Sequence, residues 1–101
     1  MPEKEWTIPF GDFALILRRV TVAGKVTSFA AVLIVSLDGK WQDITRYDTA
    51  HGFAHRDVLG RREGLRGKLI MPTLNYNHAF RYAIRDLKEN ANAYLADFLA
   101  H

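Results

Sequence analysis

The stretch Phe29-Ala30-Ala31-Val32-Leu33-Ile34-Val35 is the longest apolar run in the chain. Successive residues of a strand point to opposite faces of its sheet, so this run presents apolar side chains to both faces. A strand of this kind needs cover on both sides. We therefore predict that a strand over residues 26–37 lies in the centre of a sheet.

Two turn signals flank this central strand. Ala23-Gly24-Lys25 separates it from an aliphatic, β-branched run over residues 13–22, which indicates a hairpin. On the other side, Asp38-Gly39 is typical of a type I′ turn, because both central positions of that turn need positive φ. A third strand over residues 40–48 follows. Residues 13–48 therefore predict an antiparallel meander.

The segments on either side of the meander are less regular. Residues 1–12 alternate Trp6, Ile8 and Phe10 as on a strand, and Pro9 restricts them to a sheet edge or an extended arm. Residues 49–67 hold four of the seven glycines and show no periodicity, which predicts a long irregular loop, usually a functional or mobile feature. Residues 68–71 predict a short strand that ends at Pro72.

The C-terminal third carries the pattern of a helix. Asn75 or Asn77 can cap its start, and apolar side chains then recur every three or four residues through about residue 99. The apolar positions are Phe80, Ile84, Leu87, Ala91, Tyr94, Leu95 and Phe98. We therefore predict a single α+β domain over residues 1–101, an antiparallel β-meander of three to five strands packed by one long C-terminal helix.

One helix covers one face of such a sheet, whereas the central strand and the strand before it are apolar on both faces. The uncovered face would be a larger apolar patch than monomers usually expose. A two-fold homodimer is the simplest closure, because it buries the same patch on both copies. The alternative is that the N-terminal arm around Trp6 and Phe10 folds over that face.

Composition narrows the class of protein. Of the 101 residues, 49% are apolar and 12% aromatic, which indicates one globular domain with one core. The chain has no Cys, which excludes disulfides, thiolate metal sites and a Cys nucleophile. The charged start, Met1-Pro2-Glu3-Lys4-Glu5-Trp6, is unlike a signal peptide, and the longest apolar run is too short to span a bilayer. We expect a cytoplasmic protein with no membrane partner.

The excess positive charge is concentrated in one segment. Residues 56–68 hold five basic side chains against Asp57 and Glu63, whereas the rest of the chain carries nine of each sign. The basic residues are Arg56, Arg61, Arg62, Arg66 and Lys68. A local basic patch on a neutral body favours a polyanion or an acidic partner protein. A solvated loop kept soluble by its arginines is the alternative.

The candidate site precedes this segment and overlaps it. Residues 46–57 hold two His, two Arg and two Asp within twelve positions. Imidazole suits proton transfer near neutral pH, an Asp can orient the ring, and Arg can bind a phosphodiester bidentately. These residue types together form a metal-independent ribonuclease site. The catalytic candidates are His51, His55, Asp48, Arg46 and Arg56, with Asp57 as a second possible orienting carboxylate. The candidates for binding nucleic acid are Tyr47, as a base-stacking ring, with Arg61, Arg62, Arg66 and Lys68.

Two other interpretations compete with catalysis. Asp48, His51 and His55 would share one face of a helix and suit a metal, but Gly52 disfavours a helix, so we predict no metal and no cofactor. Alternatively, His51 and Asp48 hydrogen-bond the loop backbone while Tyr47 joins the core. Elsewhere, His78 at the helix start can either join the cluster or face solvent, and the last residue, His101, is expected to fray.

Arg46-Tyr47-Asp48, followed by His51-Gly52 and then His55, resembles a motif of small prokaryotic proteins of unknown function, some of which resemble toxin components of toxin–antitoxin modules. The resemblance covers roughly a fifth of the chain. It implies a ribonuclease-like or translation-directed toxin with a cognate antitoxin, and it carries over Asp48, His51 and His55. Those toxin-like proteins show a further His soon after the motif, whereas Arg56-Asp57 follows here, which weakens the implied catalysis.

The sequence therefore leaves two functional hypotheses. The first is an RNA-directed protein, a metal-independent endoribonuclease that uses the His/Asp/Arg cluster. The second is a non-enzymatic interaction domain that binds an acidic partner protein or nucleic acid through its basic loop. A dependence of activity on His51 favours the first hypothesis, and a salt-dependent affinity that relies on Arg61 and Arg62 favours the second.

Overall fold

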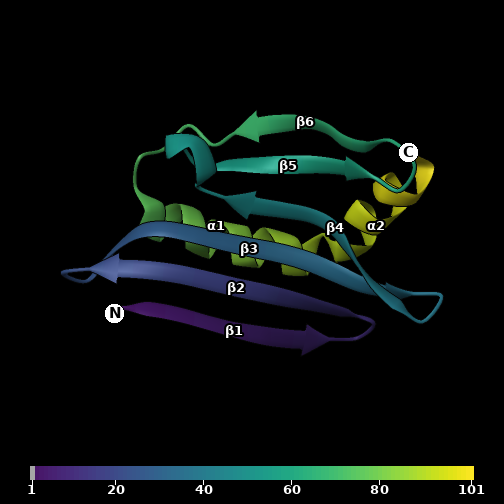
Figure 1. Cartoon of the computed structure of the whole chain (residues 1–101), viewed down its shortest axis with the longest axis horizontal. Coiled ribbons are helices and arrows are strands. Elements are labelled where there is room, and N and C mark those ends of the chain that lie inside the picture. The colour runs from purple at the N-terminus through teal and green to yellow at the C-terminus, as the bar shows by residue number, and fades with distance from the viewer. Residues whose placement is uncertain (1) are drawn as a thin grey trace.

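Six antiparallel strands follow one another across a single sheet in chain order (Figure 1). The computed structural model describes residues 2–101, so Met1, the first residue of the predicted N-terminal segment, lies outside the described residues. The strands are β1 (Glu3–Phe10), β2 (Phe13–Val22), β3 (Lys25–Leu37), β4 (Lys40–Asp48), β5 (His55–Gly60) and β6 (Gly64–Ile70). A short 3₁₀ helix, η1 (Ala50–Gly52), lies between β4 and β5.

The predicted meander is confirmed for β2, β3 and β4, and β1 pairs with β2 at one edge of the sheet. The predicted count of three to five strands is wrong. Most of the predicted loop over residues 49–67 belongs to β5 and β6, which pair through a tight turn with Gly64 at φ 71°. These two strands lack apolar alternation because ionisable side chains and glycines together fill most of their positions. Ion pairs from Asp57 link β5 to Arg46 and Lys68 on the neighbouring strands.

Two helices follow the sheet, so the prediction of one long helix is also wrong. α1 (Tyr76–Glu89) begins at Asn75, whose side chain accepts a hydrogen bond from the backbone N–H of His78, as predicted for a cap. α2 (Ala91–Ala100) begins after Asn90, where φ is −114° and ψ is 18°. The Asn90 side chain donates to the carboxylate of Asp86 at 2.8 Å, which holds the bend.

Both helices pack on the same face of the sheet, α1 across β3 and α2 across β4 and β5 (Figure 1). The core between them is aliphatic and aromatic, with Leu17, Leu33, Phe80 and Leu87 buried. β1 continues the sheet at its edge and does not fold over the opposite face. We call the side without helices the open face. No helix of residues 2–101 is long and apolar enough to cross a membrane.

Strand pairing determines which residues share a face. Arg46 pairs with Asp57, which pairs with Lys68, and Asp48 pairs with His55. Because alternate side chains point to opposite faces, these residues lie on the open face. The intervening row Tyr47, Arg56 and Leu69 points towards the helices. The strands therefore divide the predicted site between two faces.

Candidate functional site

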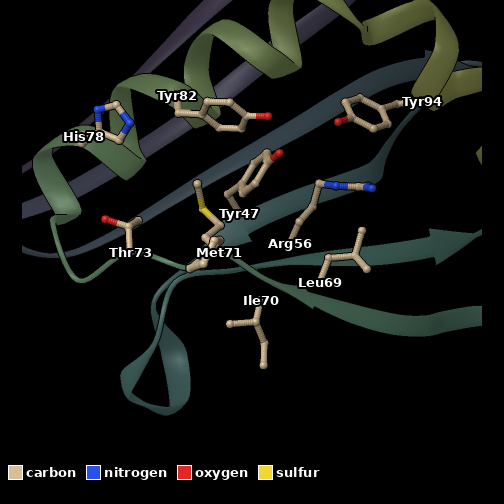
Figure 2. A pocket seen from close by; sticks show the side chains of 10 residues that line it. Tyr47, Arg56, Leu69, Ile70, Met71, Thr73, His78, Tyr82 and Tyr94 are labelled. Carbon is tan, nitrogen blue, oxygen red and sulfur yellow. The ribbon is translucent and has the colours of Figure 1, made fainter.

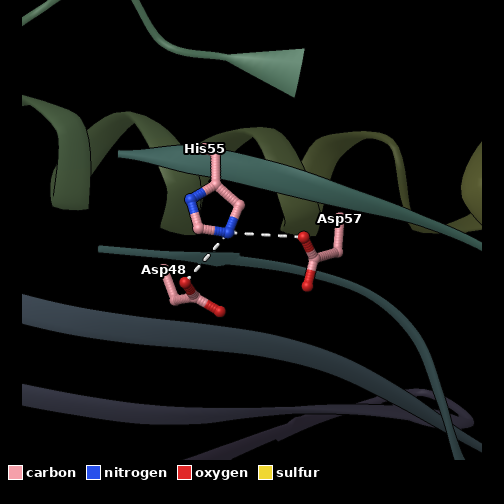
Figure 3. Close-up of side chains that lie close together, drawn as sticks. All are labelled: Asp48, His55 and Asp57. Atoms are coloured by element: carbon pink, nitrogen blue, oxygen red, sulfur yellow. Dashed lines mark ion pairs between the residues drawn. The ribbon is translucent and has the colours of Figure 1, made fainter. Parts of the chain in front are cut away.

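His55 lies between two carboxylates on the open face (Figure 3). Its Nε2 atom is 3.1 Å from Oδ1 of Asp48, at the end of β4, and 3.3 Å from Oδ1 of Asp57, on β5. The imidazole is fully buried, with 0% exposure. Three ionisable groups are thus brought together by one strand pair.

The turn between β4 and β5 fixes the orientation of this ring. Nδ1 of His55 is 3.1 Å from the carbonyl oxygen of Phe53, and because a carbonyl only accepts, Nδ1 carries a hydrogen. Asp48 also accepts from the backbone N–H of Ala50 at 3.0 Å, which anchors η1. His51 and Gly52 both take positive φ there, 71° and 84°, so that the chain reverses direction within a few residues.

Cations occupy both oxygens of Asp57. Nζ of Lys68 donates to Oδ1 at 2.7 Å, and Nε of Arg46 donates to Oδ2 at 2.9 Å. Burial, the largest single influence, raises the pKa of Asp57, but the hydrogen bonds from Lys68 and Arg46 outweigh it and hold the pKa below its usual value. The carboxylate is therefore ionised, and the cluster holds two carboxylates beside Lys68 and Arg46.

Nε2 of His55 faces a donor as well as two acceptors. Lys68 Nζ lies 3.4 Å from it, on the same side as the two carboxylates. With a proton, Nε2 donates to Asp48 and Asp57; without one, it accepts from Lys68. The four side chains thus form a hydrogen-bonded network in which Nε2 has a partner whether or not it carries the hydrogen.

The same residues offer three possible ligands to a metal ion. One ligand atom each from Asp48, His55 and Asp57 lies within 4.8 Å of the others. Lys68 and Arg46 already balance the charge of the carboxylates, and the ammonium of Lys68 stands against both Asp57 and His55. A metal would have to displace that ammonium. The donor set therefore fits a metal poorly as arranged.

A family model described as "Domain of unknown function (DUF7718)" matches residues 1–101. The chain belongs to this family. No curated protein and no solved structure matches the chain.

His51 is the exposed imidazole of the cluster. Its ring centroid lies 6.3 Å from that of His55, and its side chain faces solvent on η1. His51 and His55 therefore come together as the candidate site requires, with one ring accessible and one buried. His78 is exposed at the start of α1, on the helix side of the sheet, so it does not join them.

Arg56 and Tyr47 lie on the other face of the sheet, so their expected place in the cluster is corrected. Arg56 donates from Nη1 to Oγ1 of Thr45 at 3.0 Å. Tyr47 donates to Oδ2 of Asp86 at 2.7 Å; burial first, and then this bond, raise the pKa of Tyr47 far above its usual value. Alternation along a strand is the physical reason, since Arg56 follows His55 directly.

The remaining cations of the predicted basic loop bind groups within the chain. Arg61 pairs with Asp38 at 3.0 Å, and Arg66 pairs with Asp97 at 2.9 Å. Arg62 donates to the carbonyl of Ala100. The contacts of Arg62 and Arg66 tie the β5–β6 hairpin to the end of α2, and that of Arg61 ties it to the β3–β4 turn. Within the described residues, Arg61, Arg62 and Arg66 of the predicted basic segment therefore each have a partner in the chain.

His101 is part of the same attachment, so the expectation that it frays is wrong. Its carbonyl accepts from the backbone N–H groups of Arg62 and Glu63, and its ring lies 3.2 Å from the Glu63 carboxylate.

Sequence reasoning underrated Asp57 and Lys68 and missed Asp86 entirely. Asp57 and His55 stand two apart, which on a strand places them on one face, but the segment lacked the apolar alternation that identifies a strand. Asp86 accepts from the hydroxyls of both Tyr47 and Tyr94. No local sequence signal brings Tyr47 together with α1 and α2, because that contact depends on tertiary packing.

Proposed function

We propose that the chain acts on RNA at the open-face cluster, as a metal-independent endoribonuclease. The observation that supports this most directly is Nε2 of His55, which lies within 3.3 Å of two carboxylates and 3.4 Å from Lys68. Networks of coupled ionisable groups are typical of sites that move protons. The site consists of His51, His55, Asp48, Asp57, Arg46 and Lys68.

The chemistry follows from which groups are accessible. The 2′-hydroxyl of a ribose attacks the adjacent phosphorus while exposed His51 takes its proton. Lys68, 34% exposed, gives a proton to the leaving 5′ oxygen and regains the proton that His51 releases to solvent, while Nε2 of His55 accepts from the ammonium. Arg46, 39% exposed, has its Nη groups available for the negative charge that builds on the phosphate. The products are a 2′,3′-cyclic phosphate and a 5′-hydroxyl.

Cleavage of a fluorescent single-stranded RNA in EDTA tests this proposal. His51→Ala should lower the single-turnover rate by about 10²- to 10⁴-fold, because it removes the proton acceptor. Lys68→Met should also be slow, whereas the matched control Lys40→Met, at an exposed hairpin, should cut RNA at the wild-type rate. Folded protein that leaves RNA intact contradicts the proposal. If EDTA abolishes the cleavage and Mn²⁺ restores it, the reaction depends on a metal and the metal-independent mechanism is wrong.

The motif Arg46-Tyr47-Asp48 with His51 and His55 supports a more specific role as a cytoplasmic toxin with an antitoxin partner. Controlled expression in a bacterial host tests it. Wild-type protein should arrest growth and His51→Ala should not, at equal protein levels. Normal growth at high levels of folded wild-type protein would rule out the toxin role without affecting RNA cleavage in vitro.

The second candidate function is a non-enzymatic domain that binds a polyanion, and the charges on α1 favour it. Arg81, Arg85 and Lys88 are exposed and form no ion pair within residues 2–101, unlike Arg61 and Arg66. RNA affinity should then fall steeply with salt and with Arg81→Gln, but hardly with His51→Ala. Equal losses from both changes would count against this alternative.

A homodimer remains part of the proposal. The open face of β2 and β3 carries apolar side chains such as Ile16 and Val32, and neither β1 nor a helix lies over it. Pairing two open faces would bury the same patch on both copies.

A further inference from the structure

A groove lies on the helix side of the sheet, away from the His55 cluster (Figure 2). Its volume is about 560 Å³, within the range of small-molecule sites. Tyr47 and Arg56 form its floor, and Tyr82 and Tyr94 approach from α1 and α2. The segment from Leu69 to Thr73 forms the remaining wall, and His78 lies at the end near the start of α1.

Arg56 places a positive charge in this groove. Its guanidinium lies 4.6 Å from the centre of the Tyr94 ring, and its one hydrogen bond to a side chain goes to Thr45. No carboxylate of residues 2–101 forms an ion pair with it. The Asp86 carboxylate is occupied by the hydroxyls of Tyr47 and Tyr94 and by the Asn90 amide. The guanidinium therefore has donors to offer an anion, and its stacking on Tyr94 keeps the plane in place.

The rest of the groove suits a flat, apolar body. The Tyr82 side chain is 42% exposed and its ring stands edge to face with Tyr47, 6.3 Å between centroids. Opposite it, Leu69 and Met71 supply apolar wall, and Pro72 also lines the groove. An aromatic ring fits against an exposed tyrosine, and an anionic group fits a guanidinium plane.

We propose that the groove binds a nucleoside phosphate, with its phosphate on Arg56 and its base against Tyr82. Charge complementarity selects the phosphate, and the aromatic and apolar walls select the base. The site goes beyond the proposed cleavage reaction, because it lies on the other face of the sheet and shares no side chain with the cluster. The nucleotide comes either free in solution or as one residue of single-stranded RNA.

Isothermal titration with adenosine 5′-monophosphate tests the proposal. The full chain should bind it, with adenosine and inorganic phosphate each at least tenfold weaker, because each has only one of the two groups. Arg56→Met and Tyr82→Leu should each lower the affinity at least fivefold. The matched controls Arg18→Met and Trp41→Leu replace an exposed arginine and an exposed tryptophan elsewhere and should change it less than twofold.

Three results would overturn the proposal. They are inorganic phosphate binding as tightly as the nucleotide, adenosine binding as tightly as the nucleotide, and Arg56→Met or Tyr82→Leu matching its control. Because Tyr82 is exposed, Tyr82→Leu is expected to fold even if Arg56→Met does not. His51→Ala should bind the nucleotide like wild type, so failure of RNA cleavage would leave this test intact.

A six-nucleotide oligoadenylate distinguishes the two sources of the ligand. Binding more than tenfold tighter than the mononucleotide, and sensitive to Arg56→Met, supports a nucleotide held within RNA. Equal affinity supports a free nucleotide. The proposal would be overturned if the oligomer bound more tightly than the mononucleotide and neither Arg56→Met nor Tyr82→Leu lowered that affinity, because RNA would then bind elsewhere on the protein.

Discussion

Replacing Asp57 by Asn removes the charge on which the open-face cluster depends. The Asp57 side chain is 5% exposed and accepts from Lys68 at 2.7 Å and from Arg46 at 2.9 Å. A hydrogen bond to a charged group contributes about 1.5–3 kcal/mol. Lys68 and Arg46 can both regain water, so the lower end applies to each bond. Two such bonds give an expected loss of about 3 kcal/mol in the free energy of unfolding.

Urea unfolding at pH 7 measures this loss, and thermal melting should show a drop of about 12–24 °C for a chain of this size. Asp38→Asn is the matched control. Asp38 also pairs with an arginine, but its side chain is 86% exposed and its φ of 53° is one that Asn tolerates. Its loss should stay below about 0.5 kcal/mol. A loss below about 1 kcal/mol for Asp57→Asn would refute the buried-network reasoning.

The pH dependence gives an independent check on the same carboxylate. Because the folded state holds the pKa of Asp57 below its usual 3.8, the stability it contributes is complete above that pH. It is lost as pH falls further, through the lower folded pKa. The difference in unfolding free energy between wild type and Asp57→Asn should therefore shrink below about pH 4. A difference that stays constant to pH 2 would contradict this assignment.

Three further predictions concern the framework. Gly60→Ala should cost about 1–3 kcal/mol in urea unfolding, because its Cβ would stand 2.9 Å from the His101 backbone, whereas Gly67→Ala meets open space and should change little. Burial and the bond to Asp86 raise the pKa of Tyr94 from 10.0 to about 12, so the unfolded chain ionises first and wild-type stability should fall from pH 10 to 12, more steeply than that of Tyr94→Phe. Sedimentation equilibrium should give about twice 11.5 kDa, and a mass near 11.5 kDa would contradict a dimer through the open face.

The sequence predicts the part of the sheet whose stability comes from apolar burial. In β2, β3 and β4 aliphatic residues either alternate with polar ones or occupy successive positions, and turns that contain glycine separate the strands. The hydrophobic pattern and the turn signals therefore predict the same strands. The residue pattern of β5 is different. Its alternation is between His55 and Asp57 on one face and Arg56 on the other, all of which a hydropathy pattern registers as polar. A strand stabilised by an ionic network gives no apolar signal from which it can be predicted.

The helix break at Asn90 was hidden for a related reason. The apolar spacing continues through Leu87 and Ala91 with no Pro or Gly between them. The side-chain bond from Asn90 to Asp86 and the packing of α2 on β4 and β5 fix the bend. Tertiary contacts therefore decide what local propensity leaves open.

The division of residues 46–57 between two faces follows from a single fact, that β4 and β5 are strands. Successive side chains on a strand point to opposite faces of the sheet. Arg46 and Tyr47 therefore lie on different faces, and so do Arg56 and Asp57. The charged side chains are paired differently on the two faces. On the open face Asp57 pairs with Lys68 and Arg46, whereas on the helix face no carboxylate of residues 2–101 pairs with the Arg56 guanidinium. A guanidinium placed beside Asp57 would have been neutralised there. By turning it to the opposite face, the strand leaves it available to an anion from outside the chain.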